Sequence, residues 1–123
     1  MAENYLADAE YEVGTVLVFG GEEELTTTDT KGDRKVAGVV SENPAHLMNS
    51  GLEGEHVTPL ALQGRKPCIV IGKVEKGDII VTSAIAGYGM VDNNPAIGTV
   101  IGKAVGTKDT DEHGIVEVVV GRV

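Results

Sequence analysis

Short β-branched and apolar runs alternate with turn-forming residues along the chain. Glycine, proline, asparagine and aspartate separate these runs at intervals of roughly ten residues, a spacing typical of short strands joined by tight turns. No stretch keeps a helical apolar period over several turns, so the pattern predicts no long helix. The predicted strands are residues 14–21, 22–28, 36–40, 60–64, 68–74, 79–83, 99–105 and 115–120.

The connections between these runs are predicted from their turn residues. Gly20 and Gly21 can adopt the positive φ angles of a tight turn, so the first two runs are expected to form a hairpin. Residues 1–13 mix acidic and apolar side chains too irregularly for a helix, and we expect them to dock on the fold. Residues 29–35 predict a solvated polar loop. Arg65-Lys66-Pro67 is interpreted as a break between two strands.

The run 36–40 leads into a sharp corner at residues 41–44, Ser-Glu-Asn-Pro. We expect the run to be buried, with Gly38 small enough for another backbone to come close. Pro44 removes a ladder donor and can open a helical turn, which is predicted over residues 45–48. The serine and asparagine of the corner are interpreted as turn residues that hydrogen-bond their own backbone.

These elements predict an all-β fold, either a small sandwich or a barrel of short strands with glycine-rich turns and at most one short helical turn. At 123 residues the chain is expected to be a single domain, residues 1–123. Aromatic residues make up only 3% and tryptophan is absent, so the core must be built from valine, isoleucine, leucine and alanine. A subunit interface would supplement such a core.

The formal net charge of −9 argues against two classes of partner. Nucleic acid binding depends on lysine and arginine to neutralise phosphates, and anionic membranes repel an acidic protein, so we expect neither partner. The sequence shows no secretory signal pattern, which predicts synthesis in a cytoplasm. Cys68 is the only cysteine, so no disulfide can form within the chain.

Candidate chemistry is sparse. Gly87-Tyr88-Gly89 begins like a phosphate-binding glycine motif but lacks a third glycine and a following helix pattern. His46, His56 and His113 do not have the short spacing of a structural zinc site, either with one another or with Cys68. We interpret the histidines as exposed or loop residues and the cysteine as a small core hydrophobe.

Ser41 invites a nucleophile hypothesis, because Glu42 is beside it and His46 follows five residues later. However, neighbouring residues of a strand point to opposite faces, and no Gly-x-Ser-x-Gly motif surrounds this serine. The sequence therefore predicts no catalytic residue, no cofactor and no metal site.

Residues 36–49 and the run Leu60-Ala-Leu-Gln-Gly-Arg-Lys-Pro-Cys68 resemble a family of small domains in tail-fibre and other structural proteins of tailed phages, especially T-even-like phages of marine cyanobacteria. The resemblance continues at 2–8, Tyr11, 14–16, 19–21, 77–78, 101–104 and 118–123. More distantly, the corner Gly38-Val39-Val40-Ser41 resembles part of the C-terminal intramolecular chaperone and autocleavage domain of some phage appendage proteins.

The resemblance implies a non-enzymatic virion protein, part of a tail fibre, knob or similar appendage, that assembles with other virion proteins. Contact with the host cell surface is a further role that the resemblance suggests. The alternatives are an autoprocessing chaperone domain of a fibre and a capsid-decorating protein. Fibres of this kind are threefold, which implies a homotrimer. The strands 99–105 and 115–123 are expected to leave free edges, and a closed ring of subunits would cover them, with Val119 near the interface.

Overall fold

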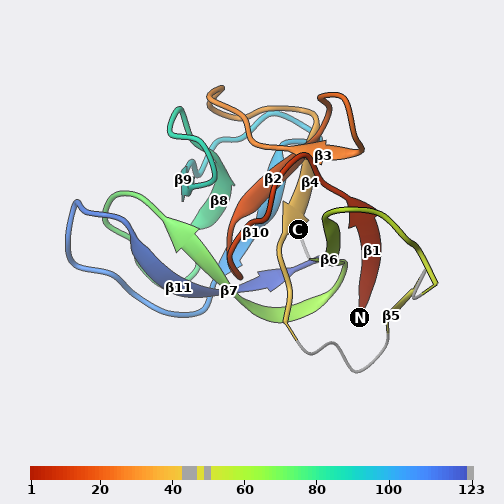
Figure 1. Ribbon diagram of the computed structural model, residues 1–123. Helices are drawn as coiled ribbons and strands as arrows, with labels where there is room; N and C mark the ends of the chain where they lie inside the picture. The colour runs from red at the N-terminus through yellow and green to blue at the C-terminus, as the bar shows by residue number, and fades with distance from the viewer. Residues whose placement is uncertain (43–46, 49–50, 122–123) are drawn as a thin grey trace.

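Figure 1 shows the computed structural model, which describes residues 1–42, 47–48 and 51–121. The described residues form strands and turns, without a helix, so the all-β prediction is confirmed. The strands are β1 (Ala2–Leu6), β2 (Val16–Phe19), β3 (Leu25–Thr26), β4 (Val36–Val39), β5 (Leu47–Met48), β6 (Val57–Ala61), β7 (Gly64–Val70), β8 (Ile79–Thr82), β9 (Gly89–Val91), β10 (Val100–Ala104) and β11 (Gly114–Val120).

The strands form a closed barrel and two three-stranded sheets. The barrel runs in the order β10-β11-β7-β9-β8, and the two sheets have the orders β5-β1-β6 and β3-β2-β4. In Figure 1 the barrel lies to the left, β1, β5 and β6 lie to the right, and β2 and β4 lie between them. Strand β4 contacts both β10 of the barrel and β6 of the other sheet, so the central sheet joins the two parts.

The last strand shows how the sequence pattern places side chains in the barrel. In β11, Val116, Val118 and Val120 are buried, whereas Ile115 before them and Glu117 between the first two are exposed. A strand with this period of two presents one face to the core and the other to solvent. The buried valines pack with residues of β7, β8 and β10 in a cluster that fills the barrel.

Strand β2 is apolar on both faces because it lies between two cores. Val16 belongs to the barrel cluster, while its neighbour Leu17 packs with Leu25, Val40 and Leu60 in a second cluster. Successive residues of a strand point to opposite faces, so each face of β2 meets a different core. A continuous apolar run is typical of a strand that is covered on both faces, and here the second cluster covers the second face.

The predicted solvated loop 29–35 is partly wrong, because Asp33 is buried there with 8% of its surface exposed. Its carboxylate accepts hydrogen bonds from Thr28 Oγ1 at 2.7 Å and from the Lys35 amide at 2.8 Å. Its own amide donates to Thr82 Oγ1 of β8 at 2.7 Å. The loop is therefore fastened to the barrel rather than held only by solvent.

The predicted strand break at Arg65-Lys66-Pro67 is wrong, because β7 runs through these residues and pairs with β11 along its whole length. The amide of Ile69 donates to Gly14 O at 2.9 Å, on the edge of β7 that faces away from β11. Pro67 is two residues earlier, so its nitrogen lies on that same edge and no β7–β11 ladder bond is lost.

Two other predictions change at the start of the chain and at the corner. The docking segment 1–13 contains a strand, β1, which pairs antiparallel with β6. Leu47–Met48 forms strand β5, parallel to β1, so the predicted helical turn over 45–48 is wrong at these two residues. The remainder of that prediction, residues 45 and 46, lies outside the described residues together with 43 and 44.

The prediction of free edges on the last two strands is also wrong. Strand β10 pairs with β8 on one side and β11 on the other, and β11 pairs with β10 and β7. Barrel closure removes the edges of both strands within one chain. The edges of β10 and β11 are therefore no reason for subunits to associate.

Candidate functional site

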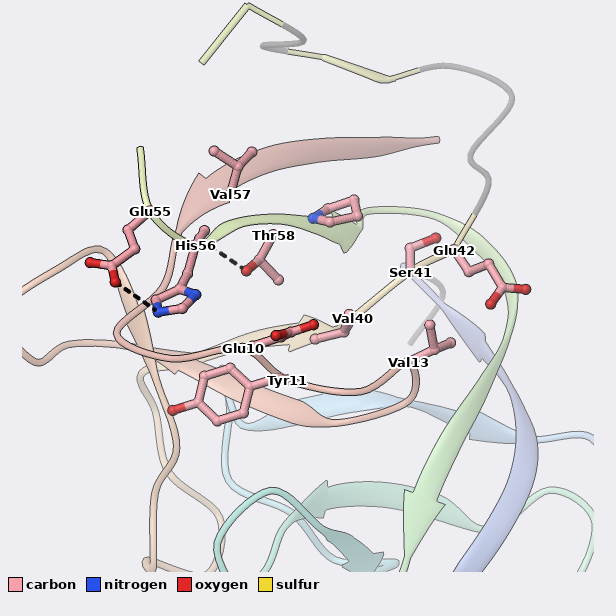
Figure 2. Close-up of a pocket in the computed structure, with 11 residues that line it drawn as sticks. Glu10, Tyr11, Val13, Val40, Ser41, Glu42, Glu55, His56, Val57 and Thr58 are labelled. Atoms are coloured by element: carbon pink, nitrogen blue, oxygen red, sulfur yellow. Dashed lines mark hydrogen bonds and ion pairs between the residues drawn. The ribbon is translucent and has the colours of Figure 1, made fainter. Parts of the chain in front are cut away.

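A recess of about 530 Å³ opens beside the corner at the end of β4 (Figure 2). Three segments that are distant in sequence form its walls: the link between β1 and β2, the end of β4, and the start of β6. Its lining includes three carboxylates, an imidazole, three hydroxyl groups and several apolar side chains. The residues are Glu10, Tyr11, Val13, Val40, Ser41, Glu42, Glu55, His56, Val57, Thr58 and Pro59.

The Asp8 carboxylate fixes the tyrosine wall of the recess. Tyr11 donates its hydroxyl to Asp8 Oδ1 at 2.5 Å, and Thr26 Oγ1 donates to Asp8 Oδ2 at 2.6 Å. Burial raises the pKa of the Asp8 carboxyl, but the hydrogen bonds from Thr26 and Tyr11 outweigh it, so the pKa lies below its ordinary value. An ionised Asp8 thus holds β3 and the Tyr11 segment together.

The imidazole of His56 lies at one end of the recess, beside Glu55 (Figure 2). Its Nε2 atom is 3.9 Å from Glu55 Oε1, and the glutamate side chain is 90% exposed, so solvent weakens the interaction between the two side chains. Thr58 Oγ1 donates to the His56 carbonyl at 3.2 Å. The acidic and hydroxyl groups suit contact with a polar or cationic surface.

Ser41 and Glu42 lie at the opposite end of the recess from His56 in Figure 2. Ser41 is buried, with 3% of its surface exposed, and its hydroxyl has no hydrogen-bond partner among the described residues. The interpretation that this hydroxyl bonds the nearby backbone is therefore not supported by residues 1–42, 47–48 and 51–121. A nucleophile needs a base within hydrogen-bond reach, and this part of the chain provides none for Ser41.

The other residues considered from sequence are scattered. Cys68 is fully buried in the barrel, and burial raises the pKa of its thiol to about 12, so the reactive thiolate is suppressed. The exposed His113 ring stacks on Tyr88 with ring centroids 5.0 Å apart. His46 lies outside the described residues. No cluster of three or more potential metal-ligating side chains occurs in the part of the chain that the structure describes.

The Gly87-Tyr88-Gly89 motif is a turn leading into β9, a strand that the sequence pattern did not predict. Ser83 Oγ donates to the carbonyls of Ile85 and Tyr88, at 3.0 and 2.7 Å, and closes this turn. The backbone of the Gly87-Tyr88-Gly89 motif thus forms the turn and the start of β9.

The described residues include no helix long and apolar enough to cross a membrane.

The sequence singled out Ser41 with its neighbour Glu42, and His56 apart from them, and the structure places all three around one recess. It missed Glu10, Tyr11 and Glu55, which complete the walls. No spacing in the sequence joins these segments, because the recess exists only after β1, β4 and β6 have packed together.

The fold defines a class: a small all-β protein in which a closed barrel is joined to two three-stranded sheets. Within this class, the chain is similar to the head fiber gp8.5 N base of bacteriophage phi29, whose crystal structure matches it with a TM-score of 0.58. The two sequences are 14% identical, and the match covers 98% of this chain and 92% of the other. At this identity the likeness is one of fold. No protein family matches the sequence, and no curated protein matches it.

Proposed function

We propose that this chain is a non-enzymatic structural protein of a phage virion, serving as the base of a fibre or similar appendage. The observation that carries the proposal is the fold similarity to a phage head fiber base, which spans 98% of this chain and 92% of the other. A match of this extent includes both sheets as well as the barrel. The independent resemblance of the sequence to tailed-phage structural proteins supports the same class.

The chemistry of the candidate residues supports a structural role. Among the described residues, the Ser41 hydroxyl has no partner that would act as a base. The Cys68 thiol is buried and has a pKa of about 12, so it is a poor nucleophile at neutral pH. The acidic recess offers hydrogen-bond acceptors at the surface, which suits contact with a neighbouring virion protein or with a host surface.

We place the protein at the base of a fibre attached to the head, since the structural neighbour is a head fiber base. The resemblance in sequence favours a tail fibre instead. A capsid-decorating protein would also lie on the head, as the proposed fibre base does. Residues 1–123 act as one domain in this proposal, because β4 contacts both the barrel and β6. We further propose that three copies associate, because the phage fibres that the sequence resembles are threefold.

Purified particles of the phage that encodes this chain would test the proposal. Mass spectrometry of the particles should detect the protein in stoichiometric amounts, in a multiple of three copies per appendage. Monovalent antibody fragments imaged by electron microscopy should label the head where fibres attach. Label on the tail would replace the head location with the tail-fibre alternative. Complete absence from purified particles would refute the virion role.

The autoprocessing alternative requires a change of mass. The intact mass of freshly purified protein should equal the sequence mass and should stay constant during storage. A fragment that appears in the wild type but not in Ser41→Ala would establish self-cleavage in place of a purely structural role.

A further inference from the structure

We propose that an apolar groove on the outside of the barrel receives the Ile97 turn of a second copy of this chain. The inference rests on the proposed self-assembly and identifies the surfaces through which the copies meet. The groove has a volume of about 490 Å³. Its lining comes from β4, β8, β10 and the loop before β10, and consists of Val36, Ile79, Pro95, Ala96, Ile97, Gly98, Val100, Gly102 and Lys103.

Ile97 is the projecting part of the interface. It is 97% exposed, which is unusual for a large aliphatic side chain that gains free energy from burial. It stands at the tip of a tight turn in which the Thr99 amide and Thr99 Oγ1 both donate to Ala96 O, at 3.4 and 2.7 Å. Gly98 has φ +83°, and Thr99 is only 1% exposed, so the turn is anchored.

The chain leading to this turn is also held in place. Asn93 Oδ1 accepts a hydrogen bond from the Ile79 amide at 2.8 Å, and Asn93 Nδ2 donates to Asp78 Oδ1 at 3.0 Å. The Asn94 amide donates to Asp92 Oδ1 at 3.0 Å. The exposed isoleucine is thus presented by a preorganised loop, and little conformational entropy is lost when it is bound.

The groove beside the loop is the matching cavity. Val36, Ile79 and Val100 are half-buried and leave apolar surface open to solvent. The Ile97 loop itself forms one wall of the groove, so a single surface both presents Ile97 and can receive it. Each copy can therefore insert Ile97 into the next copy and receive Ile97 from the previous one. Three copies placed in this way about an axis close into a ring.

Charge favours a second copy as the occupant. A chain with a net charge of −9 repels its own copies over most of its surface, and the recess at Ser41 is lined by three glutamates. Among the described residues that line the groove, Lys103 carries the only charge. Asp92 is five residues before Ile97, and we expect its carboxylate to approach this lysine when the loop enters the groove.

The association state of the wild type and two exposed-isoleucine variants tests the proposal. Sedimentation velocity from 0.5 to 200 µM should give wild type at about three times the chain mass of 12.8 kDa at the upper concentrations. Ile97→Ser should raise the concentration of half-dissociation about tenfold or more, because an aliphatic side chain loses its burial. Ile115→Ser removes an isoleucine that is 65% exposed on β11, away from the groove, and should leave the association unchanged.

Because Ile97 is 97% exposed in the single chain, Ile97→Ser should melt at the wild-type temperature when both are measured at a concentration low enough for wild type to be dissociated. An oligomer that persists in Ile97→Ser would overturn the groove as the interface and leave self-assembly intact. A wild type that stays monomeric over the whole range would overturn both self-assembly and this interface, while the virion role would still be judged on purified particles. Weaker association in Ile115→Ser than in Ile97→Ser would move the interface to β11.

Discussion

Thr82 of β8 links the barrel to the loop 29–35 and provides the clearest test of how the fold is held together. Its side chain is fully buried. Its Oγ1 atom accepts a hydrogen bond from the Asp33 amide at 2.7 Å and donates one to Thr30 O at 2.8 Å. The Thr82 carbonyl also accepts from the Gly32 amide at 3.0 Å. The variant Thr82→Val keeps the shape of the side chain and replaces only the hydroxyl with a methyl group.

The expected cost follows from the groups that Thr82→Val leaves unpaired. A buried amide without an acceptor, here that of Asp33, costs about 1–3 kcal/mol, and the lost bond to Thr30 O adds about 0.5–1.5 kcal/mol. We therefore expect the free energy of unfolding to fall by about 2–4 kcal/mol. The control Thr82→Ser keeps the hydroxyl and loses one buried methyl group, for which about 1 kcal/mol is expected.

Urea denaturation followed by far-ultraviolet circular dichroism measures both variants, since the chain lacks tryptophan. The midpoints should fall in the order wild type, Thr82→Ser, Thr82→Val, with unchanged slopes. If Thr82→Val is as stable as Thr82→Ser or more stable, the hydroxyl contributes nothing and the loop is held to the barrel by packing alone.

Three further outcomes are expected. Gly102→Ala should destabilise by about 3 kcal/mol, because the added Cβ would lie 2.3 Å from Val119 O, whereas at Gly106 the nearest atom is 3.8 Å away. Equal melting temperatures for Gly102→Ala and Gly106→Ala would contradict this close approach. Hydrogen bonds from the Lys35 amide and from Thr28 lower the pKa of Asp33, so its stabilisation is present above about pH 4 and is lost as the pH falls through the lowered value. The stability gap between wild type and Asp33→Asn should therefore shrink between pH 5 and pH 2 in thermal melts, and a constant gap would remove the link to ionisation. Native Cys68, with its pKa of about 12, should react with a disulfide reagent at pH 8 only as fast as the protein unfolds, and rapid stoichiometric labelling would show that the thiol is accessible.

The all-β class was predictable because it depends on local signals. The alternating residues of β11 and the glycines at positions 20 and 21, both with positive φ, carry their geometry in the sequence. The buried end of β4 was equally predictable, since Val39 and Val40 have few polar neighbours before the corner. Gly38 also lies against Ala61 O, 3.1 Å from where a Cβ would stand, as its small size indicated.

Predictions failed where a residue's role depends on which strand lies beside it. Pro67 looks like a strand breaker until the pairing of β7 shows that its nitrogen faces away from β11. The polar loop 29–35 looks solvated until the closed barrel brings Thr82 to Asp33, 49 residues away in sequence. The sequence suggests that β10 and β11 have free edges, but in the closed barrel each of them pairs with a neighbouring strand on both sides.

Apart from β1, β5 and β9, the sequence by itself determined the strand-forming runs, together with the valine-rich core and the acidic charge, because each depends on neighbouring residues or on composition. The tertiary structure alone decided the closure of the barrel, the recess that joins Glu10, Ser41 and His56, and the apolar groove beside Ile97. These features are made from segments far apart in the chain. Their geometry is set by strand pairing and layer packing, which local sequence patterns do not encode.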